Sequence, residues 1–168
     1  VVTLPQHFKN NGYFVQGMGK IYHNGYNDEP SWSVPWTNPK AEAYASAGNQ
    51  SMVRKKHQKA VAEGKNEDGI RAAARGMPYE GEDVADNTFH DGALAEMAVK
   101  ALRDIKQKQE PFFLAVGFIR PHLPFVSPKK YWDLYDPAKI PLAPNPFRPK
   151  GAPEYAVLEG GELRAYAN

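Results

Sequence analysis

Hydrophobic residues recur at helical spacing in two stretches of the chain, and a short segment typical of a strand follows each stretch. In the first, Thr3 can cap a helix in which Leu4 and Phe8 share a face and which Gly12 ends. Residues 13–18 come next, and their aromatic and β-branched members predict a strand. The chain therefore opens with a helix followed by a strand.

The second stretch predicts a longer helix over residues 91–107, with Asp91 as its N-cap and cationic residues on the face away from the core. Its apolar stripe consists of Leu94, Met97, Ala98, Ala101, Leu102 and Ile105. Pro111 ends the helix, and residues 112–118 are continuously apolar, which is typical of a strand covered on both faces of a parallel sheet. Two helix-strand units predict an α/β fold with a mainly parallel sheet.

Two other regions show little periodicity. Residues 24–84 contain four scattered prolines and mixed charges, and they predict a long irregular surface excursion that includes one helix between Glu42 and Glu63. Residues 119–168 are rich in proline, with nine of the fifteen prolines between Pro121 and Pro153. This segment should run over the surface in extended form, apart from a short helix at 128–135.

Composition excludes several classes of function. A chain of 168 residues with 42% hydrophobic and 24% charged residues can form one globular domain. Its net charge of +2 is too small to indicate nucleic-acid binding, and no apolar run approaches the roughly 18 residues of a membrane span. Cysteine is absent, so disulfides, thiol catalysis and zinc thiolate sites are excluded within these residues. The chain begins at Val1 rather than Met, and we expect it to be an interior piece of a longer protein.

Lys20 and His23 form the first candidate site, directly after the first predicted strand and between Gly19 and Gly25. Residues three apart in an extended strand point to opposite faces, so these two side chains can share a ligand only if the strand breaks into a turn. Lys20 would then supply a point charge for an anion, and His23 would move or orient a proton.

His122 forms the second candidate site, just past the other predicted strand. Pro121 and Pro124 restrict the backbone on both sides of it, which lowers the entropy cost of holding the ring in one place. If the two strands are parallel neighbours, His122 and the Lys20/His23 turn leave the same edge of the sheet. The alternative is that a histidine in a proline-rich loop serves only packing.

Weaker candidates each have a plain structural explanation. The basic run 54–57 with Lys59 could bind an anion, or it could be the solvated face of a helix. Trp32 and Trp36 could stack on a sugar, or they could anchor the excursion to the core.

Among the remaining polar residues, Asp28 and Glu29 could bind a cation, although the dense oxygen cluster of a calcium site is missing from the chain. His7 and His90 are expected to be structural or exposed.

At these residues the sequence resembles the sulfatase family of the alkaline-phosphatase-like superfamily, and within it the iduronate-2-sulfatase group and its bacterial relatives. The likeness covers most of the chain except residues from about 39 to 86, and residues 112–125 carry its most specific part. The matching segments are 3–6, 11–13, 19–23, 30–33, 111–117, 121–125, 128–131 and 142–144.

The resemblance implies hydrolysis of a sulfate ester, on a sulfated sugar of the iduronate-2-sulfate type, by a formylglycine nucleophile beside a calcium ion. Lys20 is similar to the lysine that contacts the sulfate and the formylglycine, and His23 to the histidine that orients and deprotonates the formylglycine hydrate. His122 is similar to the histidine beside the leaving oxygen, a candidate general acid. Lys20 and His122 would thus bind substrate, with Trp32 as a weaker candidate. The family implies a periplasmic, secreted or lysosomal location.

The chain also departs from the family pattern. It lacks the Cys/Ser-x-Pro-x-Arg nucleophile motif and the aspartate pairs that hold calcium, so we expect flanking sequence to supply both and the isolated chain to be inert. An interior piece should also leave sheet edges unpaired, which favours self-association. Two alternatives stay open. One is a phosphate or phosphonate ester hydrolase of the same superfamily, and the other is a non-catalytic module whose basic residues 54–56 and tryptophans hold a sulfated glycan.

Overall fold

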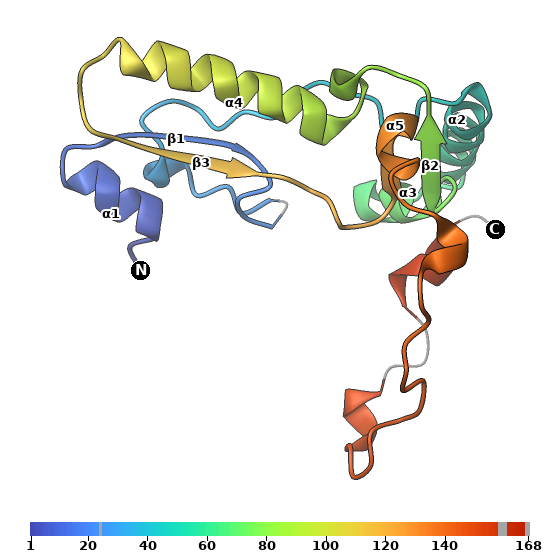
Figure 1. Cartoon of the computed structure of the whole chain (residues 1–168). Helices are drawn as coiled ribbons and strands as arrows, with labels where there is room; N and C mark the ends of the chain where they lie inside the picture. The colour runs from blue at the N-terminus through green and yellow to red at the C-terminus, as the bar shows by residue number, and fades with distance from the viewer. Residues whose placement is uncertain (24, 158–160, 167–168) are drawn as a thin grey trace. The chain divides into compact units, whose positions relative to one another are not determined.

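The computed structural model describes residues 1–23, 25–157 and 161–166, and the chain forms two compact units (Figure 1). Residues 1–43 and 85–122 form the first unit, and residues 44–84 and 123–168 form the second.

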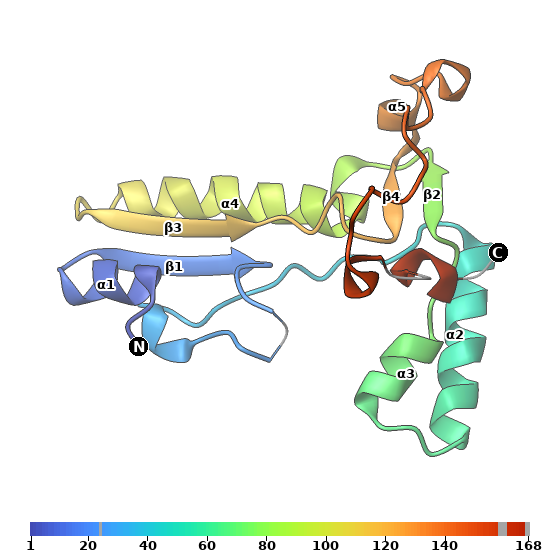
Figure 2. The ribbon, with the colours of Figure 1, turned by 90° about the horizontal axis from the view of Figure 1, so that it is seen from below.

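The first unit is built on two parallel strands that are neighbours in space. Its elements are α1 (Leu4–Asn10), β1 (Phe14–Gly19), η1 (Glu29–Ser31), η2 (Asp86–Thr88), α4 (His90–Lys106) and β3 (Phe112–Gly117). β1 and β3 pair in parallel, with Phe14 opposite Phe112 and Gly19 opposite Gly117. Helix α4 lies along one face of this pair and α1 against the other (Figures 1 and 2). The two predicted helix-strand units and their parallel pairing are therefore confirmed.

Side chains of β3 pack alternately toward the two helices. Phe113 stacks on Phe8 of α1 with 4.6 Å between ring centroids. Leu114 and Val116 point the other way, and they pack with Leu94 of α4, which is fully buried. This alternation explains why residues 112–118 are continuously apolar, since both faces of the strand are covered by a helix.

The two predicted helix starts have different outcomes. Thr3 is the N-cap of α1 as predicted, and its hydroxyl accepts a hydrogen bond of 3.3 Å from the Gln6 N–H. The prediction for Asp91 is wrong, because Phe89 occupies the N-cap of α4 and Asp91 lies inside the first turn. The Asp91 carboxylate instead accepts hydrogen bonds from a segment that is distant in sequence, as described for the site below.

The second unit contains regular structure that the sequence pattern does not reveal. Its elements are α2 (Ala47–Ala62), α3 (Glu67–Ala73), β2 (Tyr79–Glu82), β4 (Phe125–Pro128), α5 (Lys129–Trp132), η3 (Pro137–Lys139), η4 (Glu154–Ala156) and η5 (Glu162–Ala165). The predicted helix between Glu42 and Glu63 is present as α2. The helix predicted at 128–135 is present in part as α5, which covers only Lys129–Trp132 because Pro128 ends β4. β2 and β4 pair in parallel, with Tyr79 opposite Phe125. The described residues after β4 are mostly exposed.

Within the described ranges each sheet has only two strands, so every strand has an edge that lacks a full partner strand. β1 gains a single bridge there, between Met18 and Thr37. Open edges can pair with other chains, and the expected self-association stays a prediction. None of the described helices is long and apolar enough to cross a membrane.

Glu80 is a buried carboxylate that joins β2 to the start of α2. It accepts hydrogen bonds from the Ala45 N–H at 2.5 Å, from the Asn49 amide at 2.7 Å and from the Ser46 hydroxyl and N–H. Burial alone would raise its pKa, but the hydrogen bonds from Asn49, Ser46 and the backbone outweigh burial and hold the pKa of Glu80 below its ordinary value. A negative charge is also favoured at the N-terminus of a helix.

We expect Glu80→Gln to lower the free energy of unfolding of this chain by about 1–3 kcal/mol at pH 7, because the amide loses the charge and turns a donor toward other donors. Urea unfolding followed by circular dichroism measures the difference. The folded-state pKa of Glu80 is lowered, so its contribution is present above the unfolded pKa and is lost as pH falls through the folded pKa. The difference in free energy of unfolding between wild type and Glu80→Gln should therefore become smaller at acidic pH. Glu82→Gln, on the same strand, is the matched control, and equal stability of both variants would contradict the role of Glu80.

Candidate active site

The carboxyl ends of β1 and β3 lie side by side and define the candidate site. Gly19 is opposite Gly117, and the Lys20 N–H just beyond donates a 2.7 Å hydrogen bond to the Gly117 carbonyl. The loop that carries Lys20 and His23 and the loop that carries His122 therefore begin at the same edge of the sheet. This confirms the predicted placement of the two loops.

Glycine is required where the two strands end. Gly19 has φ +73°, and a Cβ there would lie 2.3 Å from the Gly117 carbonyl oxygen and 2.5 Å from Leu94 Cδ2. A Cβ on Gly117 would lie 2.0 Å from the carbonyl oxygen of Lys20. Both distances are far below van der Waals contact, so only glycine lets the first strand turn this close to the second. The expected break after β1 is thus formed by backbone packing.

The three predicted catalytic side chains are all exposed. Lys20 and His23 make no side-chain hydrogen bond or ion pair with another described residue. His122 lies in a turn in which its N–H donates to the Ile119 carbonyl at 2.9 Å. The structure brings together the loops that carry these groups, and it shows no hydrogen bond or ion pair among the three side chains themselves.

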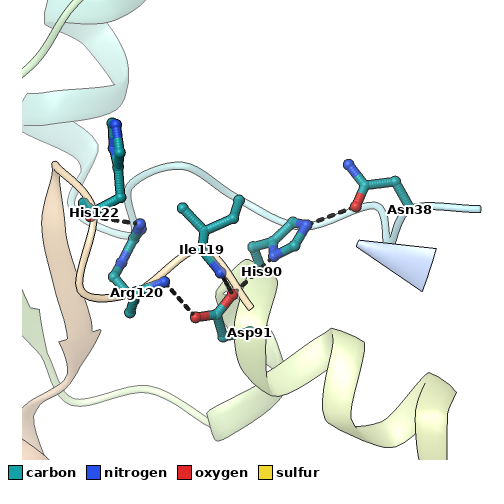
Figure 3. Close-up of polar contacts among 6 residues, drawn as sticks. All are labelled: Asn38, His90, Asp91, Ile119, Arg120 and His122. Carbon is teal, nitrogen blue, oxygen red and sulfur yellow. Dashed lines mark hydrogen bonds and ion pairs between the residues drawn. The ribbon is translucent and has the colours of Figure 1, made fainter. Parts of the chain in front are cut away.

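Asp91 in the first turn of α4 fastens the loop after β3 (Figure 3). Its two carboxylate oxygens accept hydrogen bonds from the backbone N–H groups of Ile119 and Arg120, each at 2.9 Å. The His90 ring contacts the same carboxylate through Nδ1 at 3.0 Å and Asn38 Oδ1 through Nε2 at 2.7 Å. His90 is therefore structural, one of the two roles expected for it.

Hydrogen bonding decides the charge state of Asp91. Burial alone would raise its pKa, but donors from Ile119, Arg120 and His90 outweigh burial and hold the pKa of Asp91 below its ordinary value. The carboxylate is thus ionised at neutral pH. Sequence reasoning missed this role, although one signal was available. A helix that packs antiparallel to the strand that follows it in sequence has its first turn beside the last residues of that strand.

The sequence matches the family model for sulfatases over residues 1–167. The chain belongs to the sulfatase family. It is 36% identical to the iduronate 2-sulfatases of Homo sapiens and Mus musculus over 168 residues, which covers 96% of this chain and 28% of each relative. A sulfatase of Formosa agariphila is 28% identical over 149 residues, which covers 86% of this chain and 26% of that protein. This sulfatase chain therefore spans little more than a quarter of the length of the curated relatives that it matches.

Two tryptophans of the sulfatase chain line an open cavity of about 470 Å³ beside η1. Trp32 is only 5% exposed, it packs against Gly17, and its indole N–H donates to the Asn27 carbonyl at 2.7 Å. Trp36 is half-buried and donates to the Gly19 carbonyl at 2.9 Å. These contacts favour the anchoring interpretation over stacking on a sugar, and a substrate contact by Trp32 stays a prediction.

The basic run of the sulfatase chain lies on α2, where part of its charge is used internally. Lys56 Nζ donates to the Arg75 carbonyl at 2.7 Å, and Lys59 approaches Glu63 at 3.9 Å. These contacts favour the interpretation of a solvated helix face.

In the part of the chain that the structure describes, no three His, Cys, Asp or Glu side chains are grouped to hold a metal ion. Asp28, an earlier cation candidate, accepts hydrogen bonds from the hydroxyls of Thr3 at 3.0 Å and Ser31. The described residues therefore do not by themselves form the calcium site that the family implies.

Proposed function

We propose that the longer protein containing this chain is a sulfuric ester hydrolase, and that Lys20, His23 and His122 form one side of its active site. The observation that carries the proposal is the 2.7 Å hydrogen bond from the Lys20 N–H to the Gly117 carbonyl. It ties together the two loops that bear these residues, at the carboxyl edge of a parallel strand pair, where ligands bind in open α/β sheets.

Each of the three residues has a distinct chemical task in this proposal. The Lys20 ammonium supplies fixed positive charge to the sulfuryl oxygens, where negative charge is held through the transition state. His122 donates a proton from its ring to the leaving oxygen as the sulfur–oxygen bond breaks, which releases an alcohol. His23 accepts or orients a proton on the side of the attacking group.

Other parts of the active site would come from outside this chain. The family resemblance implies an alkaline-phosphatase-like fold, a formylglycine nucleophile and a calcium ion, and residues elsewhere in the parent protein would supply the last two. A chain without nucleophile and metal lacks both the covalent step and the Lewis acid, so the isolated chain should be inert.

A sulfated sugar of the iduronate-2-sulfate type is the proposed substrate. The support is the 36% identity to two iduronate 2-sulfatases. The same resemblance supports a periplasmic, secreted or lysosomal location.

Sulfate release measured by ion chromatography tests the proposed function. The parent protein should release sulfate from a disaccharide bearing iduronate-2-sulfate and should act poorly on 4-nitrophenyl phosphate, whereas the 168-residue chain should turn over neither. A preference for the phosphate ester would favour the phosphohydrolase alternative. Tight binding of the sulfated sugar without turnover by the parent would favour the glycan-binding alternative. Sustained turnover by the 168-residue chain would contradict the need for residues outside it.

A further inference from the structure

We propose that Asp91 is a positioning residue for the hydrolysis of sulfate esters, which acts by holding the backbone of the loop that carries His122. This inference rests on the proposed function, because it assigns to Asp91 a task that matters only if His122 acts on the substrate. Asp91 itself touches no reacting atom in this proposal. In Figure 3 the His122 ring points away from the Asp91 carboxylate.

The hydrogen bonds of the loop show how much depends on Asp91. Residues 119–122 have three backbone N–H groups, because Pro121 has none. Those of Ile119 and Arg120 both donate to Asp91, and that of His122 donates to the Ile119 carbonyl. Beyond the last residue of β3, one carboxylate therefore replaces the strand ladder as the acceptor for this backbone.

A second contact closes the same loop from within. Arg120 Nη1 donates to the His122 carbonyl at 3.1 Å, so the residue that Asp91 holds by its N–H also holds the backbone of His122. The chain of contacts thus runs from Asp91 through Arg120 to His122. A carboxylate that accepts several hydrogen bonds is among the stronger anchors available to a loop.

Helix α4, which carries Asp91, is itself held firmly in the core. Asp91 lies in the first turn of α4, and Leu94 one turn later is fully buried in the core against Met18 of β1. Gly92 allows the preceding segment to come close, since a Cβ there would lie 1.8 Å from the Asp86 carbonyl oxygen. The His90 ring links the Asp91 carboxylate to the Asn38 side chain through contacts of 3.0 Å and 2.7 Å.

A positioning role differs from a purely structural one in its dependence on the leaving group. A general acid matters most when the leaving alcohol is weakly acidic, as in a sugar, and little when it is a nitrophenol. Displacement of His122 should therefore slow sugar sulfates selectively. General loss of fold would slow all substrates equally.

The kinetic experiment compares Asp91→Asn and His122→Ala in the parent protein on a sulfated disaccharide and on 4-nitrophenyl sulfate. Asp91→Asn should lower kcat on the sugar by up to about 100-fold, with KM nearly unchanged, because misplacing a catalytic group costs that much. The loss on the nitrophenyl ester should be under about threefold on the same reasoning. Asp91→Asn added to His122→Ala should cost nothing further. Asp104→Asn, an exposed carboxylate on the same helix that pairs with Lys100, is the matched control.

Amide hydrogen exchange in the 168-residue chain tests the anchor without catalysis. Exchange at Ile119 and Arg120 should accelerate in Asp91→Asn and not in Asp104→Asn. If Asp91 variants fail to fold, Asn38→Ala removes only the contact between Asn38 and the His90 ring. It should lower kcat on the sugar more than on the nitrophenyl ester, by a smaller factor than Asp91→Asn.

Equal losses on both esters, or unchanged exchange at Ile119 and Arg120, would overturn the positioning role alone. A wild-type parent without sulfatase activity would instead overturn the proposed function and this inference with it. If His122→Ala lowered kcat equally on both esters, the proposed role of His122 as general acid would be wrong, and with it the positioning role of Asp91.

Discussion

Replacement of Lys20 by alanine in the parent protein should lower kcat/KM for a sulfate ester by about 100- to 1,000-fold, the usual cost of losing one fixed electrostatic contact to a transition state. The side chain is exposed and has no ion pair or hydrogen bond with a described residue, so its charge is available to an anion. Its backbone is held at the sheet edge by the bond to Gly117. Steady-state kinetics on a sulfated disaccharide measure the loss.

Because the Lys20 side chain has no partner among the described residues, its removal should affect activity without affecting stability. Lys20→Ala should leave the free energy of unfolding of this chain within about 0.5 kcal/mol of wild type, because the side chain stabilises nothing in the described structure. Lys106→Ala, in the last turn of α4, is the control for removing one exposed positive charge. A variant that keeps full activity, or one that loses activity only because it unfolds, would contradict the proposed contact of Lys20 with the sulfate.

The placement of the two candidate loops was predictable from the sequence, because it depends on where two strands end. Aromatic and β-branched residues at 13–18 and the apolar run at 112–118 locate the strands. The residues just beyond them are Lys20 and the loop of His122. Parallel pairing then brings both loops to one edge. Asp91 was not found in this way, because its partners Ile119 and Arg120 lie 28 and 29 residues later and only the packing of α4 brings them together.

The second unit shows why its strands were missed. In β2 the usual pattern is reversed, since Tyr79 is 59% exposed whereas Glu80 is 6% exposed. A charged residue is buried there because α2 and its N-cap surround it with donors, which no rule of alternating hydrophobicity predicts. Helix α3 has no buried residue, so no contact with a core marks it in the sequence pattern. Local pattern detects elements that a hydrophobic core stabilises, and it fails where a buried polar contact does so instead.

Gly117→Ala should lower the free energy of unfolding by about 2–4 kcal/mol, the sum of an overpacked contact and a lost hydrogen bond. The added Cβ would lie 2.0 Å from the Lys20 carbonyl oxygen and 2.2 Å from its carbonyl carbon. Both are backbone atoms, so no side chain can rotate away to relieve the clash. Lys20 must move, and the 2.7 Å bond to the Gly117 carbonyl breaks with it.

Gly48→Ala is the matched control, because it makes the same chemical change in α2, where nothing lies within 4 Å of the new Cβ. It should be neutral or stabilising by up to about 1 kcal/mol, since alanine favours a helix over glycine. Urea unfolding gives both values, and amide exchange at Lys20 reports whether the loop has moved. Two alanine variants of equal stability, with unchanged exchange at Lys20, would mean that the close approach of the two strand ends does not hold the loop. The position of Lys20 at the edge of the sheet would then have to depend on other contacts.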